Sequence, residues 1–255
     1  MADLGLHVAV EDGIAEIVLD RPPLNVLDIA LLHELADTLD DLGAQRDLRL
    51  IVIRANGKAF SAGVDVGQHF GSDLGPMLEA FSRAAGRLLA SEVPTLAVAH
   101  GAALGGACEL VALADLALMA DDAQIGCPEI RLGVVPPVAA AYFPRLIGLQ
   151  RAAALILTGD AITGAEAARI GLIWKSVPRE RLDAEARAVI ERFRGLSASA
   201  LRLARRTLRG ATRLPPHQAI VEASDLQVRS IPEMADAQEG LRAFIEKRAP
   251  VWQHR

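Results

Sequence analysis

The sequence contains few of the residues that cross-link a protein or anchor it in a membrane. It has only two cysteines in 255 residues, Cys108 and Cys127. Two thiols do not make a disulfide framework, so we expect both to pack as small buried side chains. No apolar run approaches the roughly 18 residues that suggest a membrane span, and no secretory leader is visible. We therefore expect a cytoplasmic protein with no membrane partner.

An excess of positive charge is also missing. The formal net charge is −5, whereas a general nucleic-acid surface needs a clustered positive footprint. The densest basic run, Arg202 to Arg213, is interpreted as a solvated helix face. No cluster of metal-ligating residues is evident, so no metal and no nucleic-acid partner is predicted.

Aromatic residues make up only 4% of a chain that is 51% hydrophobic. The core must therefore be built from Ala, Leu, Val and Ile. Strand and helix patterns alternate from the hairpin signal at Asp12-Gly13 onward, and beyond Pro178 the pattern is wholly helical. This order predicts an α/β fold with substantial parallel pairing. We divide it into a core at 1–195 and a C-terminal helical region at 196–255, with no linker between them.

Periodicity and turn residues give the expected boundaries of the elements. Asp28 and Thr163 are predicted to cap helices, the latter with Glu166 in a capping box. Strands are expected at 6–10, 14–19, 48–53, 95–99, 115–120 and 173–177. Helices are expected at 28–42, 77–89, from 106, at 144–157 as a pair, from 163, and at 183–194, 199–209, 215–230 and 232–247.

The chain is organised around the stretch 98–132, which reads as strand, glycine-rich turn, apolar helix, short strand and acidic turn. The turn consists of small residues that leave the backbone bare, so a ligand atom can approach main-chain N–H groups. A helix beginning near Gly106 aims its unpaired N–H groups and positive dipole end at that atom. A developing oxyanion needs such an environment.

Two carboxylates, Glu109 and Glu129, lie in this otherwise apolar stretch. A glutamate in the first turn of a helix commonly serves only the helix dipole. Two carboxylates beside one oxyanion site can instead divide acid and base work, if burial and mutual repulsion keep one neutral and the other ionised. A second bare turn at 55–66, which holds Ser61 and Gly63 after a buried strand, could supply another exposed N–H.

Several motifs resemble the crotonase (enoyl-CoA hydratase/isomerase) superfamily in order and spacing: ANGKAFSAGVD, HGAALGGACEL, CPEIRLG, LILTGDAITGAEAARIGL and LRAFIEKR. The resemblance covers nearly the whole chain. It implies a crotonase-like spiral of repeated strand–strand–helix units with a C-terminal helical trimerisation region, present as a homotrimer or a dimer of trimers. It also implies an acyl-CoA substrate, with coenzyme A as part of that substrate and no tightly bound cofactor.

The same resemblance implies roles for individual residues. The N–H groups of Val64 and Gly106 would form an oxyanion hole for the thioester carbonyl. Glu109 would orient and deprotonate water for addition at the β-carbon, and Glu129 would exchange a proton at the α-carbon. The remaining substrate or coenzyme A contacts are assigned to Asn25, Ala62, Gly63, Asp65, Gly105, Pro137, Phe244 and Lys247, of which Phe244 and Lys247 would reach a neighbouring subunit's coenzyme A.

One departure concerns the segment after the second glutamate. Family hydratases usually carry a glycine-rich run there, whereas this chain has VPPVAAAYF, with Pro137 at the position of the first glycine. A proline has no N–H to offer, and the side chains of Val138 and Tyr142 are expected to reshape the acyl pocket. The segment PEIRLGVVPPVAA with the ending EGLRAFIEKRAPVWQ most resembles the cyclohexa-1,5-diene-1-carbonyl-CoA hydratases.

The sequence thus predicts reversible addition of water to an α,β-unsaturated acyl-CoA, with a cyclic dienoyl-CoA as one candidate. The altered proline segment leaves open a double-bond isomerase or a thioester hydrolase of the same superfamily. An alternative of another class is an inactive protein that binds acyl-CoA.

Overall fold

The computed structural model describes residues 4–255. Its main sheet has six strands in the order β1-β2-β3-β4-β6-β9. The edge strand β1 pairs antiparallel with β2, and every other neighbouring pair in this sheet is parallel. A second, three-stranded sheet has the order β5-β7-β8, with β5 and β7 parallel. The predicted α/β class with parallel pairing is therefore confirmed.

The strands are β1 (Leu6–Glu11), β2 (Ile14–Leu19), β3 (Leu50–Ala55), β4 (Thr95–Ala99), β5 (Ala102–Leu104), β6 (Leu116–Ala120), β7 (Gln124–Gly126), β8 (Ile162–Thr163) and β9 (Lys175–Val177). The helices are α1 (Ile29–Gly43), α2 (Leu74–Ala90), α3 (Gly106–Leu113), α4 (Pro137–Ile147), α5 (Leu149–Thr158), α6 (Gly164–Ile170), α7 (Leu182–Arg194), α8 (Ala198–Ala211), α9 (Pro216–Ser230) and α10 (Ala235–Glu246). Short 3-10 turns include η1 (Val66–His69) and η3 (Pro128–Leu132).

Local sequence signals account for many of these boundaries. The Asp28 side chain accepts the N–H of Leu31 and caps α1, and the Thr163 side chain accepts the N–H of Glu166 and caps α6. Both caps match the prediction, because an extended Ser, Thr or Asp can satisfy an N–H that the first helical turn leaves unpaired.

Three predicted helix starts are wrong by three or more residues. Helix α2, expected from Met77, begins at Leu74. The helix pair expected from Pro144 begins at Pro137, and Pro144 lies inside α4. Proline suits the first position of a helix, because that position needs no N–H within the helix and the ring fixes a helical φ. The last helix begins at Ala235 rather than Pro232.

The core is aliphatic, as the composition predicts. Phe60 and Phe143 are the largest of its fully buried side chains, and the next largest are mostly Leu and Ile. Cys108 and Cys127 are free and buried, which confirms the expected packing role. Among residues 4–255, no helix is both long and apolar enough to cross a membrane.

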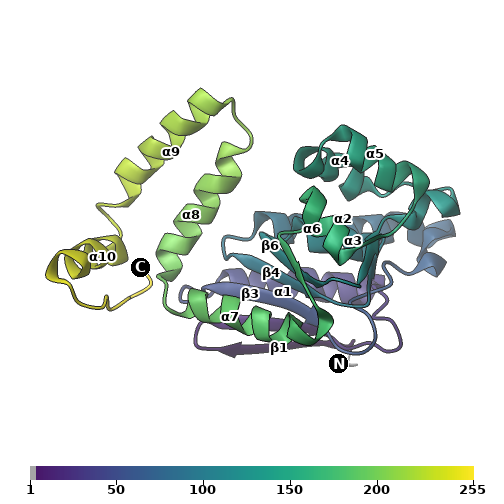
Figure 1. The fold of residues 1–255 in the computed structure, drawn as a ribbon, viewed down its shortest axis with the longest axis horizontal. Coiled ribbons are helices and arrows are strands. Elements are labelled where there is room, and N and C mark those ends of the chain that lie inside the picture. The colour runs from purple at the N-terminus through teal and green to yellow at the C-terminus, as the bar shows by residue number, and fades with distance from the viewer. Residues whose placement is uncertain (1–3) are drawn as a thin grey trace.

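Helices α8, α9 and α10 extend away from the sheets as an arm, with α4 and α5 at the opposite end of the view (Figure 1). The basic run on α8 is not simply a solvated face, so that interpretation was wrong. Arg205 is only 6% exposed and forms an ion pair with Asp115, as does the half-buried Arg209. The boundary at residue 195 between core and helical region stays a prediction.

Candidate active site

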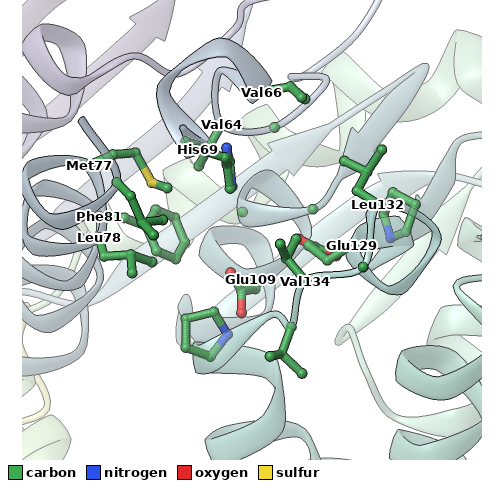
Figure 2. Close-up of a pocket in the computed structure, with 18 of the residues that line it drawn as sticks. Val64, Val66, His69, Met77, Leu78, Phe81, Glu109, Glu129, Leu132 and Val134 are labelled. Atoms are coloured by element: carbon green, nitrogen blue, oxygen red, sulfur yellow. The ribbon is translucent and has the colours of Figure 1, made fainter. Parts of the chain in front are cut away.

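A cavity of about 400 Å³ opens between the two bare turns, α2 and the segment before α4. Figure 2 shows the side chains of Glu109 and Glu129 beside this space. Eight of the residues that the sequence singled out line it: Ala62, Gly63, Val64, Gly105, Gly106, Glu109, Glu129 and Pro137. Residues up to 75 positions apart in sequence, from 62 to 137, are thus brought together.

The two bare turns are joined by backbone hydrogen bonds. Ser61 and Ala103 form a parallel bridge, in which Ser61 N donates to Ala102 O at 3.0 Å and Leu104 N donates to Ser61 O at 3.1 Å. The Ser61 hydroxyl also accepts the N–H of Gly63 at 3.0 Å. This short ladder fixes the position of Val64 relative to the start of α3.

Gly106 is the first residue of α3, so its N–H has no acceptor within the helix. A Cβ atom at Gly106 would lie 2.7 Å from Cγ2 of Val64 and 2.8 Å from Cε2 of Phe81. Only glycine therefore fits between these two side chains. The arrangement places Gly106 against the Val64 side chain.

Glu109 lies in the first turn of α3 and is 1% exposed. The N–H of Ala139, in the first turn of α4, donates to its Oε1 at 2.5 Å. Burial raises the pKa of Glu109 to about 8; the amides of Ala139 and Val138 oppose the rise, and the charge of Glu129 adds to it. The carboxyl group is therefore mostly neutral at pH 7.

Glu129 lies on η3 and is half-buried. Its Oε2 is buried without a hydrogen-bond partner in the described chain. Burial raises the pKa of Glu129, while attraction to His69 acts in the opposite direction. The environments of the two glutamates thus differ, as a division between acid and base requires.

His69 is a polar cavity residue that the sequence did not indicate. It ends η1, and its Nδ1 lies 2.9 Å from the backbone oxygen of Asp65. Figure 2 shows its ring among the residues around the cavity. The only sequence signal for a role of His69 was its nearness to the glycine turn at 55–66. The 3-10 turn η1, which directs the side chain inward, has no strong sequence signature.

The segment around Pro137 positions the Glu109 side chain although it lacks the glycine-rich run of the family hydratases. Pro137 is the first residue of α4 and lines the cavity, and the N–H that it lacks has no partner within a helix in any case. Ala139, two positions later, supplies the amide to Glu109. Val138 and Tyr142 are not among the lining residues, so their expected effect on the pocket was wrong.

The rest of the cavity wall is apolar. Helix α2 contributes four side chains to one side, and the end of η3 with the residues after it contributes the other side (Figure 2). This helix thus forms one wall of the pocket. These wall residues are Leu74, Met77, Leu78 and Phe81 on α2, with Leu132, Val134 and Val135 opposite.

Four of the residues assigned to ligand contacts do not line the cavity in this chain. Asn25 is 2% exposed, and its amide donates to the backbone oxygens of Asn56 and Ala59 at 2.9 Å. Asp65 caps η1 by accepting the N–H of Gly67. Phe244 is 84% exposed and Lys247 is also exposed, both at the end of α10. Within one chain these four support the fold or face solvent.

Among the described residues, no group of three or more His, Cys, Asp or Glu side chains could hold a metal ion. The absence of a metal and of a tightly bound cofactor stays a prediction. What the site offers chemically is the backbone of Val64 and Gly106, two carboxyl groups in unlike environments and an apolar cavity. These are the components for polarising a carbonyl and moving protons at neighbouring atoms.

The family model described as "Enoyl-CoA hydratase/isomerase" matches residues 9–255. The chain belongs to this family. The protein is therefore an enoyl-CoA hydratase-like enzyme of the crotonase superfamily, and its strand–strand–helix units, such as β1-β2-α1 and β4-β5-α3, belong to the crotonase fold.

Individual relatives match over nearly their whole lengths. The chain is 37% identical over 242 residues to a Mycobacterium bovis protein named "Probable enoyl-CoA hydratase", covering 94% of each. It is also 37% identical to the cyclohexa-1,5-dienecarbonyl-CoA hydratase of Thauera aromatica, covering 93% of this chain and 92% of that one. The solved enoyl-CoA hydratase of Bacillus anthracis superposes with a TM-score of 0.92 at 27% identity, covering 98% and 100%.

Proposed function

We propose that the protein adds water reversibly across the α,β double bond of an acyl-CoA thioester. The single observation that carries this proposal is the pairing of Glu109 and Glu129 in one cavity with the backbone of Val64 and Gly106. Family membership supports hydratase chemistry, and this geometry supplies a group for each step of it.

The amides of Val64 and Gly106 hold the thioester oxygen and withdraw electrons from the conjugated system. The β-carbon becomes electrophilic, and the negative charge that develops on the oxygen after attack is stabilised; one such donor typically contributes about 10²–10³ in rate. Water then forms its C–O bond at the β-carbon, and the electron pair of the double bond moves toward the thioester.

The two glutamates complete the proton balance. Glu109 accepts one proton from the attacking water, and Glu129 delivers one proton to the α-carbon. The reacting pair therefore carries one proton between its two carboxyl groups. In the empty site, burial favours that proton on Glu109. The reacting form instead has the proton on Glu129. It is therefore the less populated of the two arrangements that carry one proton.

The acyl group that we propose is compact and apolar, with a cyclic dienoyl thioester as the first candidate. An apolar wall surrounds the two glutamates in a cavity of about 400 Å³. The relative from Thauera aromatica is named for a cyclic substrate, and its match extends over the proline segment. Straight-chain enoyl-CoA is the second candidate, because other relatives carry the general hydratase name.

The active unit that we propose is a homotrimer or a dimer of trimers. Large apolar side chains are exposed along the arm, including Val228, Leu241 and Ile245, and another copy would cover them. Phe244 and Lys247 would then reach the coenzyme A bound to that copy, which is consistent with their distance from the cavity of their own chain. Light scattering of the purified protein measures the number of copies.

A thioester panel tests the proposed function. Crotonyl-CoA, a long-chain enoyl-CoA and a cyclic dienoyl-CoA are assayed by loss of the conjugated thioester absorbance, and the products are weighed by mass spectrometry. Hydration adds one water, isomerisation leaves the mass unchanged, and hydrolysis frees coenzyme A. A protein that binds the thioesters and converts none of them is the inactive binding protein.

Variants connect the activity to the two carboxyl groups. We expect Glu109→Gln and Glu129→Gln each to reduce kcat by about 10²–10⁴, the usual contribution of a positioned acid or base. Glu79→Gln, at an exposed position of α2, is the matched control and should retain parental turnover. Unchanged turnover in either active-site variant removes that residue from the mechanism.

A further inference from the structure

We propose that Arg209 and Tyr142 form a positioning pair for Glu109, so that helix α8 sets the geometry of a carboxyl group that it does not touch. The inference rests on the proposed function in one respect, namely that Glu109 handles a proton. It is carried by a chain of hydrogen bonds that joins α8 to α3 and α4.

The Arg209 guanidinium bonds to both helices that hold Glu109. Its Nη2 donates to the backbone oxygen of Leu113, the last residue of α3, at 2.9 Å. Its Nη1 donates to the phenolic oxygen of Tyr142 on α4 at 2.5 Å. One planar group thus connects the end of the helix that carries Glu109 to the helix that begins at Pro137.

The Glu109 carboxyl group lies across the same contact between helices. Tyr142 follows Ala139 by three residues, so the two are about one turn apart on α4. The Ala139 N–H donates to Oε1 of Glu109 at 2.5 Å. A change in the spacing of α3 and α4 must therefore alter this hydrogen bond, and Arg209 restrains that spacing.

Arg209 is itself held in one orientation. Its Nε and Nη2 donate to Oδ1 of Asp115 at 3.0 and 2.7 Å. The other carboxylate oxygen of Asp115 accepts from Arg205 Nε at 2.6 Å and from the backbone and side chain of Thr95 at 2.9 and 3.0 Å. Such forked contacts fix a guanidinium in a way that a lysine ammonium cannot reproduce.

Tyr142 gives this pair a specific test. It is the only tyrosine in the chain, and Tyr142→Phe removes one oxygen while it leaves the ring that packs against the core. A purely structural role of the network affects the melting temperature alone. A positioning role also changes the titration of Glu109, because the Ala139 amide lowers the pKa of that carboxyl group.

Few other titratable groups face Glu109 and complicate this titration. They are Glu129 on η3 and Cys127 directly before it. In the described chain neither of them is hydrogen-bonded to Arg209 or Tyr142, so a shift caused by Tyr142→Phe is transmitted through α4.

The experiment compares the parent, Tyr142→Phe, Arg209→Lys and Arg213→Gln. Arg213 is exposed just beyond the same helix and serves as the control. Infrared difference spectra follow the carboxyl band that is lost in Glu109→Gln as the pH is raised, without substrate. Hydration kinetics are measured in parallel with the best thioester of the panel.

We expect the Glu109 band in Tyr142→Phe and Arg209→Lys to persist to higher pH than in the parent. We also expect kcat to fall about tenfold, less than the roughly 10²-fold cost of a 1 Å misplacement, with KM within about twofold. Variants that melt earlier but keep the parental titration and kcat overturn the inference. If no thioester is hydrated, the proposed function fails, and the infrared titration still decides whether the pair positions Glu109.

Discussion

Gly105 lies directly against the carboxyl group of Glu129. A Cβ atom built on Gly105 would approach Oε1 of Glu129 to 2.8 Å, and the backbone at Gly105 has a φ of +57°. The conformation therefore requires glycine at this residue, which immediately precedes α3, and an added Cβ would push the end of the Glu129 side chain aside. The same bare backbone that exposes the amide of Gly106 also makes room for the second glutamate.

Gly105→Ala should consequently displace Glu129 and strain the turn. We expect kcat to fall by at least about tenfold, given that a 1 Å misplacement costs about 10²-fold. We also expect a loss of about 1–3 kcal/mol in the free energy of unfolding, the cost of holding a residue other than glycine in a sparsely populated backbone conformation with positive φ. Gly86→Ala on α2, where a Cβ meets no atom within 4 Å, is the control. Parental turnover in Gly105→Ala would show that Glu129 does not need this position.

The raised pKa of Glu109 predicts a pH-dependent stability. The folded-state pKa is about 8, against 4.5 for an unperturbed glutamate. Between pH 4.5 and 8 the folded protein holds a proton on Glu109 that the unfolded chain releases. The contribution of this group to the free energy of unfolding is therefore full below pH 4.5 and is lost as the pH rises to about 8. Glu109→Gln should lack this contribution.

Thermal unfolding from pH 5 to 8 measures this difference. We expect the melting temperature of Glu109→Gln relative to the parent to increase steadily over that range, while Glu79→Gln runs parallel to the parent. Parallel curves for Glu109→Gln would mean that the protein does not keep this carboxyl group neutral.

The same pKa sets the alkaline limit of activity. If the pair needs one proton, kcat/KM for hydration should be bell-shaped and should decline above a pH of about 8, where Glu109 loses its proton. Initial rates in buffers of constant ionic strength measure the profile. Activity that stays level well beyond pH 9 contradicts a shared proton.

His69 should affect the acid limb of that profile. Electrostatic attraction between His69 and Glu129 acts to lower the pKa of Glu129. His69→Gln should therefore move the acid limb of the profile to higher pH and leave the alkaline limb in place. His217→Gln, at an exposed position of α9, controls for the loss of a histidine elsewhere. An unmoved acid limb would show that His69 does not act on Glu129.

Local sequence signals predicted much of the fold, because they report on short-range physics. The caps at Asp28 and Thr163 and the hairpin around Asp12-Gly13 depend on residues within a few positions of one another. The glycine turns and the two glutamates could likewise be found, because bare backbone and isolated charge are visible in a linear pattern.

Contacts between distant segments could not be predicted in the same way. Arg209 lies 94 residues beyond Asp115 and 67 beyond Tyr142, so its burial depends on how α8 packs. The inward direction of His69 depends on a 3-10 turn. The amide of Ala139 could not be assigned to Glu109, because proline at 137 was taken as a loss rather than as the start of a helix.

The bridge between Ser61 and Ala103 makes two properties of the site independent of each other: the spacing of the two backbone turns and the side chains of the cavity wall. Protein engineers often want to change such properties separately. The spacing of the two turns that carry Val64 and Gly106 depends on this ladder, whereas Leu74, Met77 and Leu78 belong to α2. A directed-evolution library at those three positions would diversify the cavity wall while the backbone of Val64 and Gly106 stays in register. Phe81 should be excluded from the library, because it packs closely over Gly106.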